Sequence, residues 1–174
     1  MVRGRGFLGV KIPRAELKAL LLFTTVDDDY PQLASLALYP NGTLAASNGH
    51  TLVIRGELPE PEYPKLVHPL WTQEALRGAS RGLVDMTDPT QIHHPKNPFP
   101  QLSRLVPKWG KGGDPDFYCD SEYLALLDKV ARAARMKSRH WRIWSSGTLD
   151  PIRCELHQSD PLWTVVIMPV RVRV

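Results

Sequence analysis

The chain has 174 residues, of which 43% are hydrophobic and 23% are charged, and it carries a formal net charge of +4. These values are ordinary for a soluble globular protein and suit one compact domain or two small ones. The mildly basic balance fits a polyanionic partner but does not require one. No apolar run approaches the ~20 residues that span a bilayer, and the basic N-terminus has no sustained apolar core after it. We therefore expect a cytoplasmic protein without a membrane segment or a signal peptide.

The two cysteines, Cys119 and Cys154, are too few for a disulfide framework and lack the paired spacing of a metal site. Both lie in strand-like runs, where a buried free thiol behaves as a small apolar residue. This cysteine usage agrees with a reduced compartment. We expect no metal ion and no cofactor.

Residues 5–58 predict a first β-α-β-β-β unit, which begins with a short strand over 7–12. Pro13 fits the first position of the following helix, where its missing N–H costs nothing. Apolar and small side chains share one face of this helix, namely Leu17, Leu20, Leu21 and Thr24. We expect the helix to end at Asp27–Asp29.

Two strands at 33–39 and 43–46 then predict a hairpin around Pro40-Asn41-Gly42. The chain continues through Asn48-Gly49 into a third strand over 51–58. Asn-Gly favours a tight turn because both residues tolerate the positive φ that such turns need.

Residues 59–113 form a proline-rich stretch, in which we expect a short helix over 71–78 and otherwise connecting segments. Residues 114–174 then repeat the order of the first unit. A strand over 116–119 precedes a helix capped by Asp120 or Ser121. Apolar residues recur along this helix at helical spacing, namely Tyr123, Leu127, Val130 and Ala134. Strands over 140–145, 151–157 and 163–172 complete the unit. We expect the two units to form a single domain over 1–174, because neither accounts for both faces of its sheet alone.

Two segments carry a family resemblance, LAASNGHTL at 44–52 and VVIMPVRV at 165–172. They resemble the ATDGHRLA-like and VMPMRL-like segments of the bacterial sliding clamp, the DNA polymerase III beta subunit. LVHPLWTQEALRG at 66–78 is similar to a strand and helix of the family's middle domain. NPFPQLSRLVPK at 97–108 resembles its FPDYRRVLPK linker, and 116–174 resembles the second half of its last domain.

The resemblance implies an α+β, clamp-like fold, in which two β-α-β-β-β units place antiparallel sheets on one side and helices on the other. It also shows departures, because the family's first domain and the first half of its last domain have no counterpart here. A full ring of six such domains cannot be made from one or two of these chains.

The resemblance further implies a peptide-binding pocket that grips partner proteins of DNA replication or repair. By matching positions, the pocket would use Gly49, His50, Leu52, Pro107, Val166, Met168, Pro169 and Val170. Methionine suits such a groove because it adapts to varied side chains. Thr51 replaces the family's usual arginine, and Ser47-Asn48 replaces Thr-Asp, which alters the polarity expected of the pocket. The alternative interpretation is a plain core strand over 166–172 and a turn histidine at 50.

The same family lines its ring with helices that face duplex DNA. The helix near the C-terminus is basic on its exposed side, and the first helix adds further cations, so the candidate phosphate contacts are Arg14, Lys18, Lys129, Arg132, Arg135, Lys137 and Arg139. The alternative is an ordinary solvated helix face. Sequence-specific reading is not expected, because no helix-turn-helix or zinc-finger spacing is present.

The sequence gives little support to an enzyme. Ser47 and His50 lie three residues apart, but no nucleophile elbow surrounds them. Asp114, Asp116 and Asp120 lack the ligand pattern of a cation loop. We therefore expect a non-enzymatic, clamp-like protein that binds peptide motifs of polymerase or repair partners, with double-stranded DNA as a further candidate partner. Two alternatives stay open: a non-specific DNA-binding module that uses the basic helix, and a structural homo-oligomer that pairs the Val165–Val172 edge with another chain.

Overall fold

A computed structural model describes residues 10–25, 30–60, 63–79, 82–87, 89–92, 98–108, 119–147, 150–157 and 159–168. In chain order the elements are β1 (Lys11–Pro13), α1 (Arg14–Leu20), the 3₁₀ turn η1 (Leu21–Phe23), α2 (Pro31–Ala34), β2 (Leu36–Leu38), β3 (Leu44–Ser47), β4 (Thr51–Arg55), β5 (Lys65–Val67), α3 (Pro69–Gly78), β6 (Leu83–Asp85), β7 (Gln91–Ile92), α4 (Leu102–Leu105), α5 (Ser121–Ala133), β8 (Trp141–Trp144), β9 (Ile152–Leu156) and β10 (Trp163–Ile167).

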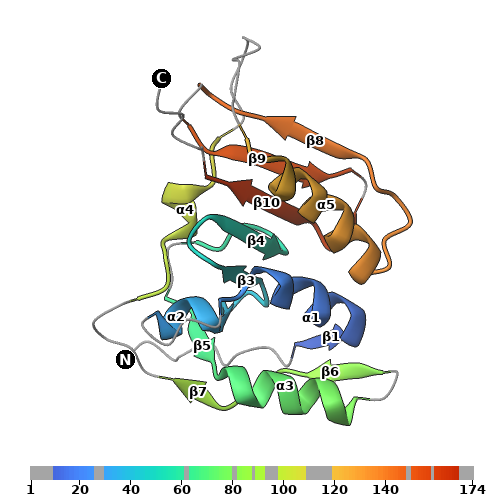
Figure 1. The fold of residues 1–174 in the computed structure, drawn as a ribbon. Helices are drawn as coiled ribbons and strands as arrows, with labels where there is room; N and C mark the ends of the chain where they lie inside the picture. The colour runs from blue at the N-terminus through green and yellow to red at the C-terminus, as the bar shows by residue number, and fades with distance from the viewer. Residues whose placement is uncertain are drawn as a thin grey trace.

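The strands form one eight-stranded sheet in the order β7-β5-β2-β3-β4-β10-β9-β8 and a two-stranded sheet of β1 and β6 (Figure 1). Neighbouring strands of the large sheet pair antiparallel. At its centre, β4 pairs with β10, so segments more than 100 residues apart in the sequence lie side by side. This arrangement confirms the predicted α+β class with antiparallel sheets.

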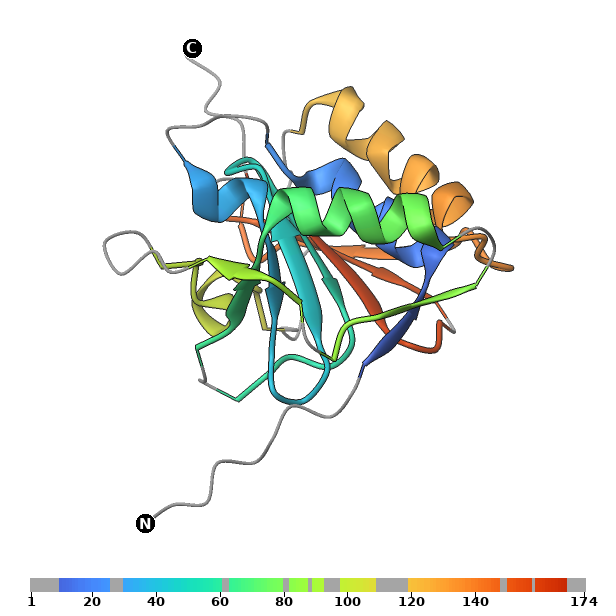
Figure 2. The same ribbon diagram turned by 90° about the horizontal axis from the view of Figure 1, so that it is seen from below.

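Helices α1, α3 and α5 lie together over one face of the sheet, and α4 lies on the other face (Figure 2). Strand alternation divides the buried side chains between these faces. Val53 and Val165 point toward the helices, while Leu52 and Val166 point toward α4. The large sheet is therefore buried on both faces at its centre, which explains the continuous apolar run in β10.

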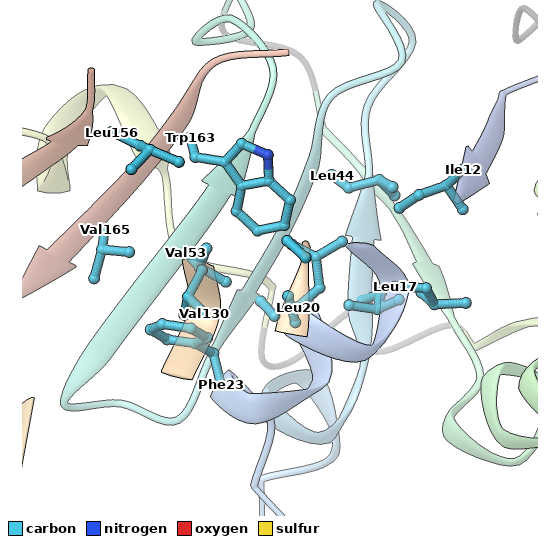
Figure 3. Close-up of a cluster of buried hydrophobic side chains, with 14 of the residues drawn as sticks. Ile12, Leu17, Leu20, Phe23, Leu44, Val53, Val130, Leu156, Trp163 and Val165 are labelled. Atoms are coloured by element: carbon cyan, nitrogen blue, oxygen red, sulfur yellow. The ribbon is translucent and has the colours of Figure 1, made fainter. Parts of the chain in front are cut away.

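The core on the helix side brings together residues far apart in sequence (Figure 3). Trp163 of β10, Leu20 of α1, Val53 of β4 and Val130 of α5 belong to this one cluster. Trp163, Leu20, Val53 and Val130 are fully buried. Burying each such side chain contributes roughly 1.5–3 kcal/mol, so this cluster attaches the C-terminal strands to the N-terminal unit.

Helix starts follow their local chemistry. The Asp120 carboxylate accepts a hydrogen bond from the Glu122 amide at 2.9 Å, which confirms Asp120 as an N-cap. Pro13 is the N-cap residue of α1, one position before the predicted one, and α1 ends at Leu20. Helix α3 begins at Pro69, two residues before the predicted start, because His68 caps it.

Residues 59–108 hold more regular structure than the predicted short helix. Strands β5, β6 and β7 each have two or three residues, and α4 has four. Such short elements give no periodicity to read, and the surrounding prolines favour an interpretation as loop. Residues 7–9 of the strand predicted over 7–12, residues 116–118 of the strand predicted over 116–119, and Asp27–Asp29 lie outside the described residues.

The free strand edge at 165–172 that the structural-oligomer alternative requires is not open in the described part of that strand. Strand β10 pairs with β4 along one side and with β9 along the other, so both rows of its backbone groups are used. The structural-oligomer alternative loses the edge on which it was based. Within the described part of the chain, no helix has the length and apolar character needed to cross a membrane.

Candidate peptide-binding site and basic helix face

The turn between β3 and β4 presents the first half of the predicted pocket. Gly49 has a φ of 88°, in the left-handed region that glycine adopts without strain. The Asn48 side-chain oxygen accepts hydrogen bonds from the His50 and Thr51 amides at 3.0 and 2.8 Å. Ser47 Oγ accepts a bond from the Gly49 amide at 3.1 Å and donates to the Thr51 carbonyl at 2.9 Å. The Ser47-Asn48 pair therefore fixes the turn that exposes Gly49 and His50.

Thr51 does not contribute a polar group to the pocket. Its side chain is fully buried, and its hydroxyl bonds to the Asn48 side-chain oxygen at 3.0 Å. Alternation along β4 places it on the helix side with Val53. The residue that stands where the family has arginine is thus part of the turn. Ser47 Oγ is likewise bound within the turn, so it is not presented to His50 as a nucleophile.

The pairing of β4 with β10 joins the two predicted halves of the pocket. Leu52 lies opposite Val166, and the Met168 amide extends the ladder by donating to the His50 carbonyl at 2.9 Å. Alternation places His50 and Met168 on the same face as Leu52 and Val166, away from the helices. Leu52 and Val166 are buried, Met168 is half-buried, and Gly49 and His50 are exposed.

Pro107 reaches this face through the segment that follows α4. Its carbonyl oxygen accepts a hydrogen bond from Arg153 Nη1 at 2.8 Å. Arg153 lies opposite Val166 in the β9–β10 ladder, so Pro107 is held beside the same strand. The structure thus brings together Gly49, His50, Leu52, Pro107, Val166 and Met168 around the β4–β10 seam; Pro169 and Val170 lie outside the described residues.

Two charged residues that support this face were not predicted. Arg153 pairs with Glu155, and their side chains are only 11% and 16% exposed. The alternating pattern Ile152, Arg153, Cys154, Glu155, Leu156 gives the one sequence signal for them, because it places both charges on the same side of a strand.

The segment before Pro107 also packs on this face. Phe99, Leu102 and Val106 are buried against Leu52 and Val166, with Leu105 partly buried beside them. The spacing of Phe99, Leu102, Leu105 and Val106 is helical and could have indicated this packing. These residues cover Leu52 and Val166. The exposed part of the seam is therefore limited to the surface near His50 and Met168.

A cavity of about 200 Å³ lies at the start of α4 rather than at the predicted pocket. Its lining residues are Tyr39, Pro59, Glu60, Tyr63, Pro64, Phe99, Gln101, Leu102 and Ser103. The Tyr39 hydroxyl is buried with no hydrogen-bond partner within the described ranges, and burial raises the pKa of Tyr39. None of the six predicted pocket residues that the structure describes lines this cavity.

The predicted phosphate contacts lie on α1, on α5 and in the segment that follows α5, and α1 packs on α5 over one face of the sheet (Figure 2). Six are exposed: Lys18, Lys129, Arg132, Arg135, Lys137 and Arg139. Arg14 differs, since it is half-buried and its Nε donates to the Leu76 carbonyl at 2.9 Å, which ties α1 to α3. Asp128 partly neutralises the group by pairing with Arg132 at 2.6 Å and Arg139 at 3.7 Å.

Arg135 has an unusual backbone. Its φ is 58°, and the Met136 amide donates to the Ala131 carbonyl at 2.8 Å, so the end of α5 forms a Schellman motif with arginine where glycine is usual. This geometry turns the chain sharply after α5 and leaves the Arg135 side chain exposed.

The described residues show no group of three metal-ligating side chains. Burial raises the pKa of the Cys154 thiol to about 12, and the nearby Cys119 adds to this shift. Burial, followed by the charge of Asp120, also raises the pKa of Cys119, which is half-buried and precedes α5 outside any strand. Neither thiol has the depressed pKa of a nucleophile.

Comparison with known proteins gives matches in structure alone. No protein-family model matches the sequence, and no curated protein matches it significantly. The DNA polymerase III subunit beta of Pseudomonas aeruginosa superposes with a TM-score of 0.64 at 15% identity, covering 98% of this chain and 68% of that one. The Bacillus subtilis sliding clamp gives 0.65 at 13% identity, covering 99% and 67%. The Thermotoga maritima beta subunit gives 0.67 at 11%, covering 99% and 68%. The chain therefore has the fold of the bacterial DNA polymerase III β sliding clamps, over about two-thirds of the length of those proteins.

Proposed function

We propose that this chain is a non-enzymatic, sliding-clamp-like protein of DNA replication or repair that binds short peptide motifs of polymerase or repair partners. The clamp fold supports this role, and the β4–β10 seam is the observation that carries it. Two segments far apart in sequence meet there, and the hydrogen bond from the Met168 amide to the His50 carbonyl supports a site that both residues share.

The seam offers the chemistry that a peptide side chain needs. Leu52 and Val166 are fully buried and support the site from beneath, and the half-buried Met168 can adjust to the shape of a bound leucine or phenylalanine. The exposed His50 supplies a ring that can donate or accept a hydrogen bond at the rim. Pro107 borders the site because Arg153 holds its carbonyl.

A fluorescence-anisotropy titration with a labelled peptide of the Gln-Leu-x-Leu-Phe type tests this proposal. We expect micromolar binding by the wild type and a loss of about tenfold or more in Met168→Ala. Met136→Ala is the matched control, because Met136 is also half-buried but packs on the helix side. Absence of binding by the wild type, or equal binding by both variants, would refute the proposal.

Non-specific binding of duplex DNA is the second candidate function. It is favoured by the packing of α1 beside α5, which gathers exposed cations from two elements on one face. Such contacts release counterions, so affinity should fall with salt with a slope of roughly 0.9 per phosphate contact.

Charge reversal separates this candidate from peptide capture. Lys129→Glu with Arg135→Glu should weaken duplex binding and flatten the salt dependence, while Met168→Ala should leave both unchanged. Arg104→Glu serves as the control, because Arg104 is an exposed cation on α4, on the opposite face. No duplex affinity even at low salt would rule this candidate out.

A further inference from the structure

We propose that the outer edge of β8 receives an extended segment of a partner protein as an added antiparallel strand, and that this segment carries acidic side chains toward its C-terminal end. This surface lies at one end of the eight-stranded sheet, apart from the β4–β10 seam (Figure 1). The inference is therefore separate from the peptide site, and it shares only Lys137 and Arg139 with the candidate DNA contacts.

Among the described residues, β8 lacks a neighbour that corresponds to β1, the strand paired with its counterpart β6. Strand β6 follows helix α3 and is paired along Val84 by Ile12 of β1. Strand β8 stands in the equivalent place after helix α5, but in the part of the chain that the structure describes it pairs with β9 alone. The first unit thus supplies an antiparallel strand at a position that the second unit leaves open.

The ladder determines which backbone groups of β8 face outward. The His157 amide donates to the His140 carbonyl at 2.8 Å, so these two residues form a hydrogen-bonded pair. In an antiparallel ladder such pairs alternate with non-bonded ones, and Arg142 and Trp144 therefore bond toward β9. Trp141 and Ile143 direct their N–H and C=O groups away from the sheet, where an added strand would meet them.

The edge also exposes apolar surface. Ile143 lies opposite Cys154, which belongs to the core on the helix side, yet the Ile143 side chain is 41% exposed. On the same side of the sheet, Leu124 of α5 is 39% exposed. An open strand edge with apolar side chains is a ready template for strand addition.

The charges beside β8 indicate which kind of partner segment would bind at its edge. Lys137, Arg139 and His140 precede β8 and are exposed, whereas the residues after Trp144 include two serines and Asp150. The C-terminal end of an antiparallel partner strand would lie beside the cationic end of β8, so acidic side chains there are complementary. A second copy of this chain could pair in two equally overlapped registers about a two-fold axis, and one of them would place Arg142 opposite its own copy at roughly 4.5 Å between Cα atoms.

The test uses a fluorescent peptide in which alternating valines and threonines precede three glutamates, with a second peptide that carries the glutamates at its N-terminal end. We expect the first peptide to bind more tightly. Ile143→Pro removes an outward N–H without touching the bonds to β9, and proline is tolerated at sheet edges. Ile143→Thr is the matched control, because it removes the apolar side chain but keeps the N–H. The proline variant should bind about tenfold more weakly than the threonine variant.

Hydrogen exchange in the wild type keeps the proposal testable if Ile143→Pro does not fold. The amides of Trp141 and Ile143 should gain protection when the first peptide is added. Equal affinity of the two variants, no preference between the peptides, or unchanged exchange at these amides would each overturn the proposal. A dimer in sedimentation whose formation Ile143→Pro abolishes would also overturn it, since the occupant would then be a second copy.

Discussion

Arg153 joins two segments that are distant in sequence, because its Nη1 donates to the carbonyl oxygen of Pro107 at 2.8 Å. The same guanidinium pairs with the carboxylate of Glu155, and both side chains are largely removed from solvent. One buried cation thus holds the segment after α4 against the sheet beside Val166. The position of Pro107 at the candidate pocket depends on this contact.

We expect Arg153→Met to destabilise the protein by about 3 kcal/mol, because it leaves the Glu155 carboxylate buried without its partner. The double variant Arg153→Met with Glu155→Leu should recover much of this loss, since no unpaired charge is left. Urea unfolding measures both changes. A double variant as unstable as the single one would show that the ion pair is not the source of the loss.

Arg135→Gly should raise the free energy of unfolding by about 1 kcal/mol, because a left-handed backbone strains any residue with a Cβ. Arg135→Ala keeps the strain and is the control. Thermal unfolding of the two variants gives the comparison. If duplex DNA binds the basic helix face, Arg135→Gly should at the same time weaken that binding, so stability and affinity would change in opposite directions.

Stability should fall in alkaline solution through the Cys154 thiol. Its folded pKa of about 12 lies above the reference value of 9.0, mainly because of burial. The folded state therefore holds the thiol proton more tightly, so this contribution is complete below pH 9.0 and is lost as the pH rises toward about 12. Unfolding free energies measured across this range should fall more steeply for the wild type than for Cys154→Ala. Parallel profiles would contradict the prediction.

We expect the chain to unfold in a single transition, as one domain. The β4–β10 pairing and the contact of α1 with α5 tie the N-terminal and C-terminal units through shared core residues. Tryptophan fluorescence, which includes the buried Trp163, should therefore change together with the backbone circular dichroism on heating. Two separated transitions would indicate two independent units.

The strongest local signals in the sequence predicted their structures well. Asn48-Gly49 gave the turn because only a few residue types tolerate positive φ, and Asp120 gave the start of α5 because its carboxylate bonds a free amide. The apolar run at 163–167 correctly predicted a strand, but it did not predict that β4 and β9 are the neighbouring strands. Whether a strand lies at an edge depends on topology, which no local pattern encodes.

In the candidate site too, contacts that depend on the path of the chain could not be predicted from local sequence patterns. The family-like segments placed Leu52 and Val166 together correctly, as the ladder shows. The contact of Arg153 with Pro107 could not be predicted, because it depends on a chain path between two segments without any shared pattern. Strands β6 and β7 are too short for periodicity, so their pairing with β1 and β5 was also not predictable.

The central β4–β10 seam has a consequence for synthesis. Strand β4 is made early, yet the strand that covers its edge is the last element of the described chain to leave the ribosome. Until then the nascent chain carries an apolar strand that pairs with β3 on one side but whose donors and acceptors on the other side have no partner, the kind of surface that chaperones protect and that other chains can capture. Loss of β10 by premature termination would leave β4 and β9 both open, so truncated products should aggregate rather than persist as a smaller folded unit.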